Sequence, residues 1–148
     1  MKIVSGGQTG VDRGALDAAI GLGIPHGGWC PCGRLAEDGR IPDRYALSET
    51  DSPEYWVRTE QNVIASHATL ILCRGQPTGG TELTVRMAAQ HGRPCLVVDL
   101  DQPQHPTEVH RWLKEHKVAV LNVAGPRESQ SPGIAAQTKQ FLRGLFAP

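Results

Sequence analysis

The segment Lys2-Ile-Val-Ser-Gly-Gly-Gln-Thr-Gly-Val-Asp-Arg-Gly-Ala-Leu-Asp-Ala-Ala19 decides the fold. A short apolar run gives way to glycines, and apolar residues then recur at helical spacing as far as Leu22. The pattern predicts a strand over residues 2–5, a glycine turn, and a helix over residues 10–22. Glycine amides approach a ligand closely and a helix start adds free N–H donors, so this turn predicts a binding site for an anion such as phosphate.

A second glycine turn, Pro77-Thr-Gly-Gly-Thr-Glu82, follows the clearest predicted strand, which covers residues 68–73. A helix over residues 79–91 is expected after this turn, so the second motif repeats the strand, turn and helix of the first. Two more apolar runs, residues 94–99 and 118–123, predict buried strands. Apolar strands that alternate with helices are typical of a parallel sheet covered on both faces. The sequence therefore predicts an α/β, doubly wound fold with a mainly parallel sheet.

The remaining apolar periodicity predicts three further helices. They are expected over residues 54–66, over residues 107–116, and from residue 131 toward the C-terminal end. In the first of them, Trp56 and Ile64 are expected to face inward.

Residues 24–50 are rich in glycine and proline and show no clear helical or strand pattern. A loop of this length in a compact domain is usually functional or mobile. The segment is either a solvated surface loop or a flap over the site, and in the second case Arg34 reaches an anionic ligand.

Ligands of doubly wound folds bind beyond the carboxyl ends of the strands, and both glycine turns lie at such ends. We expect the two turns to face one cleft. The first would hold a phosphate or another oxyanion through backbone amides, and the second would hold another part of the ligand. The predicted ligand-binding residues are Gly6, Gly7, Gln8, Thr9, Gly10, Asp12, Arg13, Arg34, Gly79, Gly80, Thr81 and Glu82.

Several of these residues also have a structural interpretation. Thr9 and Asp12 are candidates for a helix cap that resembles a capping box. Arg13 either pairs with a phosphate or lies on a solvated face of the helix, and in the first case its replacement by alanine is expected to weaken binding by about 30-fold or more. Glu82 is a candidate to accept a proton or to bind a sugar hydroxyl. Alternatively, it is an acidic residue in the first helical turn that the helix dipole favours.

Composition narrows the range of partners. The 148 residues carry a formal net charge of zero and no basic block, so a nucleic-acid polymer is not an expected partner. No apolar run approaches the roughly 20 residues of a membrane span, so no membrane association is expected. We expect a cytoplasmic protein whose four cysteines are thiols.

No motif for a metal site or a common catalytic machinery stands out. Cys30-Pro-Cys32 lacks two further ligands for a closed zinc site, so no metal site is predicted, although binding of a soft metal or a cofactor by these thiolates is left open. The first turn has neither the G-x-G-x-x-G spacing of dinucleotide sites nor the Gly-Lys-Ser/Thr of a Walker loop. A nucleophile elbow is also absent. What remains is an anion site for a small ligand.

Five stretches together resemble a known family. They are Ser5-Gly-Gly-Gln-Thr-Gly-Val-Asp-Arg13, Gly28-Trp-Cys-Pro31, Arg58-Thr-Glu-Gln-Asn62, Gly79-Gly-Thr81 and Asn122-Val-Ala-Gly-Pro-Arg127. The sequence resembles the putative molybdenum carrier family, also called circularly permuted YpsA-like proteins, over nearly the whole chain. This family is similar to the Rossmann-like group that contains the LOG phosphoribohydrolases.

The resemblance implies a single Rossmann-like ligand-binding domain over residues 1–148, a small ligand that carries a phosphate, and homo-oligomers, either dimers or tetramers. The family's name implies the molybdenum cofactor, molybdopterin, as cargo. Together with the residues, it predicts a binding or carrier protein for a phosphate-bearing heterocycle, either the molybdenum cofactor or a nucleotide.

An enzyme of the LOG type is the first alternative. LOG enzymes carry Pro-Gly-Gly-x-Gly-Thr-x-x-Glu, whereas Glu82 here directly follows its threonine. A shift of two positions turns a helical residue by about 200° around the axis, so Glu82 is not expected to point where the catalytic glutamate of LOG enzymes points. A nucleotide N-glycosidic hydrolase would have to use Glu82 all the same. A nucleotide-sensing signalling module is the second alternative.

Overall fold

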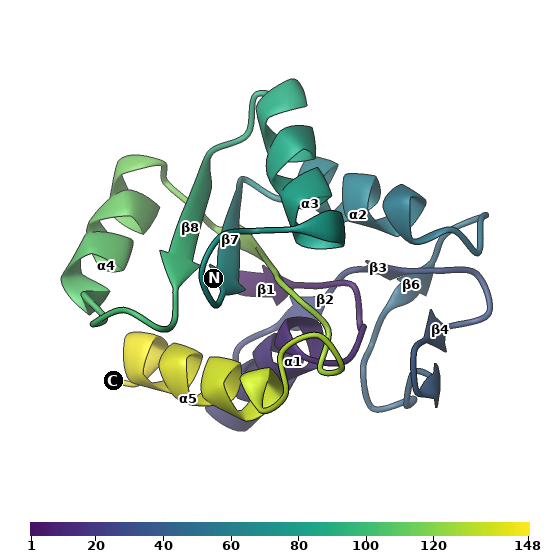
Figure 1. The fold of residues 1–148 in the computed structure, drawn as a ribbon. Coiled ribbons are helices and arrows are strands. Elements are labelled where there is room, and N and C mark those ends of the chain that lie inside the picture. The colour runs from purple at the N-terminus through teal and green to yellow at the C-terminus, as the bar shows by residue number, and fades with distance from the viewer.

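The central sheet of the computed structural model, which describes residues 1–148, has five parallel strands in the order β2-β1-β9-β7-β8 (Figure 1). The strand bounds are β1 Lys2–Val4, β2 His26–Gly27, β7 Ala68–Cys73, β8 Cys95–Asp99 and β9 Val120–Ala124. The last strand, β9, is therefore inserted between β1 and β7, in register with Ile3 opposite Leu121 and Leu70 opposite Val123.

Helices cover both faces of this sheet. Their bounds are α1 Val11–Leu22, α2 Tyr55–Ile64, α3 Gly79–Gln90, α4 Pro106–Glu115 and α5 Ile134–Phe146. Helices α1, α4 and α5 pack on one face through a shared core, and α2 and α3 lie together on the other face (Figure 1). This arrangement confirms the predicted fold class, an α/β doubly wound sheet with helices on both faces.

Strand β7 shows why the central strands are apolar throughout. Its six residues are all buried, with Leu70 and Leu72 in the larger core and Ile71 and Cys73 in a cluster on the opposite face. Successive side chains of a strand point to opposite faces, and here both faces are covered by helices. The predicted bounds of this strand, residues 68–73, are confirmed.

Two expectations about burial were wrong. Strand β8 was expected to be buried, but it lies at the edge of the sheet and leaves the side chain of Val97 40% exposed. On α2, Trp56 and Ile64 were expected to face inward, but they are 48% and 39% exposed. Only Val63 of the helix's apolar residues is fully buried, and the other two buried residues of α2, Thr59 and Asn62, are polar.

The segment of residues 24–50 is more regular than expected. Strand β2 completes one edge of the main sheet. The other strands of the segment form two small sheets, in which β3 (Trp29–Cys30) pairs in parallel with β6 (Ser48–Glu49) and β4 (Leu35–Ala36) pairs antiparallel with β5 (Gly39–Arg40). A second small core holds the segment against α1.

Gly10 fixes the first glycine turn against the loop that follows β9. Its φ is +80°, and a Cβ atom at this position would lie 2.4 Å from the carbonyl oxygen of Pro126. The next amide, that of Val11, donates a hydrogen bond of 3.2 Å to the same carbonyl. Only glycine tolerates both the backbone conformation and the close approach. The turn after β1 and the loop after β9 are therefore held side by side at the carboxyl edge of the sheet.

Candidate functional site

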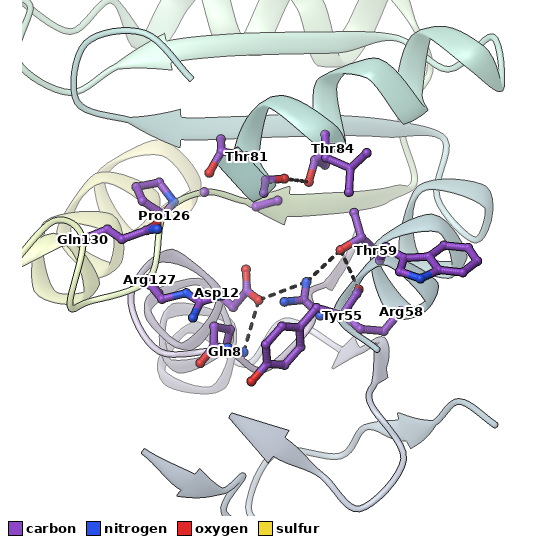
Figure 2. Close-up of a pocket in the computed structure, with 15 residues that line it drawn as sticks. Gln8, Asp12, Tyr55, Arg58, Thr59, Thr81, Thr84, Pro126, Arg127 and Gln130 are labelled. Carbon is purple, nitrogen blue, oxygen red and sulfur yellow. Dashed lines mark hydrogen bonds and ion pairs between the residues drawn. The ribbon is translucent and has the colours of Figure 1, made fainter. Parts of the chain in front are cut away.

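A pocket of about 90 Å³ lies at this carboxyl edge, where β9 is flanked by β1 and β7 (Figure 2). The first glycine turn and the start of α1 contribute Gln8 and Asp12 to its wall, and the second turn contributes Gly80 and Thr81. The remaining wall comes from α2, from the first two turns of α3, and from the end of β9 with the loop that follows it. The structure thus brings the two glycine turns to one pocket, as expected from the sequence.

Three helices begin at this pocket, and their N-termini make it favourable for an anion. Residues of the first turns of α1, α2 and α3 all line it. In α3, the amides of Thr81 and Glu82 donate to the carbonyl of Thr78, whereas Gly79 and Gly80 donate to no backbone carbonyl. Free amides and aligned helix dipoles place partial positive charge at the pocket.

Two arginines add full positive charge. Arg58 comes from α2 and Arg127 from the loop after β9, and the guanidinium carbons lie 5.6 and 5.4 Å from the centre of the Tyr55 ring. The side chain of Arg58 is only 13% exposed. A Cβ atom on Gly6 would lie 2.6 Å from Nη1 of Arg58, so the bare backbone of the first turn lets this guanidinium pack against it.

One carboxyl group, that of Asp12, is buried among these cationic groups. Its Oδ2 accepts the backbone N–H of Gln8 at 3.2 Å and lies 3.7 Å from Nη1 of Arg58 (Figure 2). Burial raises the pKa of Asp12 above its ordinary value, and the charge of Arg58 opposes part of that shift. Asp12 therefore reaches back to the turn and also lines the pocket, but the predicted capping box is absent, because the N-cap is Gly10 and the amide that Asp12 accepts is that of Gln8.

Two unpaired hydrogen-bond donors belong to residues of the pocket wall. Oε1 of Gln8 accepts hydrogen bonds from the backbone amides of Thr9, at 3.0 Å, and Glu37, at 2.9 Å. Nε2 of the same side chain donates to no partner. Nε of Arg58 also has no partner. Only one other buried side-chain polar atom in the chain, Oγ1 of Thr138, lacks a partner. Buried donors are nearly always paired, so these two remain available for a partner that the chain itself does not supply.

Thr9 and Arg13 lie on the far side of the first turn. The α1 helix begins without a side-chain cap, and Oγ1 of Thr9 instead accepts the amide of Glu128 at 3.1 Å and bonds to the carboxylate of Glu37. Arg13 forms an ion pair with Asp38, including an Nη2–Oδ1 contact of 2.7 Å, and its Nε donates to the carbonyl of Gly7. Neither side chain lines this pocket; both line a separate cavity of about 480 Å³ on the other side of the turn.

Arg34 is also turned away from the pocket. It is 8% exposed, and its guanidinium donates to the carbonyls of Ile41 at 3.1 Å, Pro42 at 2.8 Å and Tyr45 at 2.9 Å. The expected reach of Arg34 toward a ligand is therefore corrected: its donors hold its own loop together.

Glu82 lies outside the pocket wall as well. Its side chain is 57% exposed and lies 3.8 Å from Nε of Arg86, one helical turn further along α3. This position corrects the expectation that Glu82 completes the site, and it agrees with the expected rotation away from the LOG arrangement.

Sequence reasoning missed much of the wall that α2 and the last loop provide. The lining residues absent from the predicted site include Tyr55, Arg58 and Arg127. Arg127 carried a usable signal, because it follows the final predicted strand at the carboxyl edge of the sheet.

The structure contains no group of three or more His, Cys, Asp or Glu side chains placed to hold a metal ion. Cys30 is buried in the small core with Tyr45, and Cys32 is exposed. None of the helices is long and apolar enough to cross a membrane.

Comparison with known proteins gives two matches. The model of the circularly permutated YpsA SLOG family matches residues 3–146. The structure is also similar to the crystal structure, at 1.45 Å resolution, of a putative molybdenum carrier protein from Syntrophus aciditrophicus SB. The two chains are 47% identical, with a TM-score of 0.96 over 99% of this chain and 94% of the other. A search of curated proteins finds no match.

Proposed function

Because the chain belongs to the circularly permutated YpsA SLOG family, we propose that it is a binding protein for a phosphate-bearing heterocycle whose oxyanion occupies the pocket of Figure 2. The observation that carries the proposal is the pair of unpaired buried donors, Nε2 of Gln8 and Nε of Arg58, at a pocket where three helices begin. An oxyanion supplies the acceptors that these donors lack and is favoured by the helix dipoles.

The heterocycle has room beside the oxyanion. A second cavity of about 220 Å³ adjoins the pocket and shares Thr81, Pro126 and Gln130 with it. Together the two cavities reach the roughly 300 Å³ at the small end of the range for ligand pockets, which combine their volume with a few placed polar groups. The phosphate end would lie against the glycine turns and the ring system would extend over Pro126.

The molybdenum cofactor and a nucleotide are the two ligands that fit this description. The molybdenum cofactor is a pterin that carries one phosphate and holds its metal through its own dithiolene. The donors at the pocket suit that phosphate, and the similar protein from Syntrophus aciditrophicus SB is named a putative molybdenum carrier protein. We propose the molybdenum cofactor as cargo, in a cytoplasmic homo-oligomer, with a nucleoside monophosphate as the alternative ligand.

Native mass spectrometry of the protein purified from its own host tests this proposal. A bound species with the mass of a phosphorylated pterin supports the carrier role, and a bound nucleotide supports the alternative ligand. The proposal is contradicted if the protein carries nothing and calorimetry detects no binding of phosphate or of adenosine monophosphate at millimolar concentration.

The hydrolase alternative is tested separately. Incubation with adenosine monophosphate, followed by chromatography for free adenine, detects cleavage of the N-glycosidic bond. The exposed position of Glu82 disfavours this reaction, so we expect no adenine above the level of a protein-free control. Adenine release that disappears in Glu82→Gln would favour the enzyme instead.

A further inference from the structure

A buried carboxyl group is an unusual neighbour for a bound anion. The side chain of Asp12 is 4% exposed and lines both the main pocket and a small cavity behind it. A fully ionised anion beside an ionised carboxylate is repelled, and the repulsion is strong where water is excluded. The arrangement becomes favourable when one proton lies between the ligand and the carboxyl group.

The ionisable side chains around Asp12 come from two helices and one loop. Helix α1 contributes Arg13, whose guanidinium is already paired with Asp38, and α2 contributes Tyr55 and Arg58. The loop after β9 contributes Arg127. Helix α3 and the strands contribute no ionisable side chain to the pocket wall.

The geometry of Asp12 leaves one oxygen for the ligand. Oδ2 is the atom that accepts the amide of Gln8 and faces Arg58. The other carboxylate oxygen points into the pocket, toward the start of α3 (Figure 2). An ionised carboxylate is an acceptor only, so a ligand that meets this oxygen must bring a proton.

We propose that Asp12 makes the pocket selective for oxyanions that carry a proton, so that the protein binds phosphate and rejects sulfate. This inference rests on the proposed function, because it assumes that an oxyanion occupies the pocket. Phosphate and its monoesters hold or regain a proton near neutral pH, whereas sulfate has none to donate. The free donors of Gln8 and Arg58 then bind the unprotonated oxygens.

Acidification is expected to relax the selection. When Asp12 takes up the proton itself, its carboxyl group becomes a donor and accepts a fully deprotonated oxyanion. Burial favours this protonated form at a higher pH than for an exposed aspartate. Sulfate should therefore bind more tightly as the pH falls, with uptake of one proton per ion bound.

Calorimetric titration with sodium phosphate and sodium sulfate at pH 7.5 and constant ionic strength tests the proposal. In the wild type we expect phosphate to bind about 30-fold more tightly than sulfate, since an unrelieved clash of two buried charges is of the size of a lost buried pair. In Asp12→Asn the side-chain amide can donate to sulfate, so the preference should fall below about threefold. Asp101→Asn makes the same chemical change at an exposed site outside the pocket and should keep the wild-type preference.

The outcomes separate the two claims. If the wild type binds both ions within threefold of each other, or Asp12→Asn keeps the full preference, the selectivity is overturned and the proposed oxyanion site stands. If the wild type binds neither ion nor adenosine monophosphate, both claims fail. Should Asp12→Asn not fold, the wild type alone decides, because the affinity for sulfate relative to phosphate must rise as the pH is lowered from 7.5, and a flat profile overturns the proposal.

Discussion

The guanidinium of Arg58 lies 3.7 Å from the carboxylate of Asp12, and this pair joins the start of α1 to the start of α2 beside the pocket. Both side chains are largely buried, and burial costs each charge its hydration. The net effect on Asp12 is a raised pKa, so the attraction of Arg58 does not fully offset the desolvation of the carboxylate. The buried carboxylate of Asp12 therefore lowers the stability of the fold, as is common at binding sites.

Replacement of Asp12 by asparagine should stabilise the protein at neutral pH. A carboxyl group whose pKa is raised on folding favours the protonated form in the folded state. Its ionisation thus lowers the free energy of unfolding, increasingly so as the pH rises from about 4, the ordinary pKa, through the folded-state pKa. We expect the Tm of Asp12→Asn to exceed that of the wild type at pH 7 and the difference to vanish near pH 4. Scanning calorimetry measures both values, and a lower Tm of the variant at pH 7 contradicts the assignment.

The two arginines near the first turn should respond differently to truncation. Arg58→Ala removes a buried charge that lines the pocket, and the loss of one charged partner typically costs about 2–5 kcal/mol of binding, or roughly 30-fold or more in affinity. Arg13→Ala breaks an ion pair outside the pocket and should change the affinity for phosphate by less than about threefold. Calorimetric titration of both variants with phosphate measures the contrast, and an equal loss in the two would show that the pocket is misplaced.

Local sequence pattern did not reveal which of these two arginines lines the pocket. The glycine turn and the start of α1 follow from local pattern, so a cationic residue near the turn was easy to find. The orientation of each arginine depends on contacts with residues far away in the sequence. Arg13 forms an ion pair with Asp38, 25 positions further along the chain. Arg34 was misplaced for a similar reason, since the carbonyls that bind it belong to a loop whose path the sequence does not reveal.

Alanine at two glycines should have opposite effects on stability. Gly10→Ala places a Cβ atom 2.4 Å from the carbonyl oxygen of Pro126 at a φ of +80°, and strain of this kind costs about 1–3 kcal/mol before the clash is added. Gly21 lies inside α1 with open space around it, so Gly21→Ala should stabilise the protein by up to about 1 kcal/mol. Urea unfolding monitored by circular dichroism compares the two, and a Gly10→Ala variant as stable as the wild type contradicts the described turn.

Arg34 should matter for its own loop and not for the ligand. Its guanidinium is the donor that pairs the carbonyls of Ile41, Pro42 and Tyr45, and unpaired buried carbonyls cost about 1–3 kcal/mol each. We expect Arg34→Ala to lower the free energy of unfolding and to speed proteolytic cleavage between residues 35 and 47, while the affinity for phosphate per folded molecule changes less than about threefold. A large loss of affinity in the folded variant would restore Arg34 to the site.

The fold itself was largely predictable, and its exceptions have a common cause. The turns at Gly6 and Gly79 and the strand of residues 68–73 are encoded by glycine position and apolar runs, which act locally. The exposure of Val97 depends on strand order, because only the sheet topology places β8 at an edge. Trp56 is exposed because the buried side of α2 carries the polar residues Thr59 and Asn62, and the spacing of apolar residues alone does not identify that side.

The central claim is that the two glycine turns bind one oxyanion together. A titration of ¹⁵N-labelled protein with sodium phosphate, followed by amide chemical shifts in solution, tests it most directly. The account predicts that the backbone amides of Gly79 and Gly80 and the side-chain amide of Gln8 shift along the same saturation curve, with one dissociation constant, and that Arg58→Ala weakens all of these changes in parallel. Shifts confined to one turn, or two curves with different dissociation constants, would contradict the account.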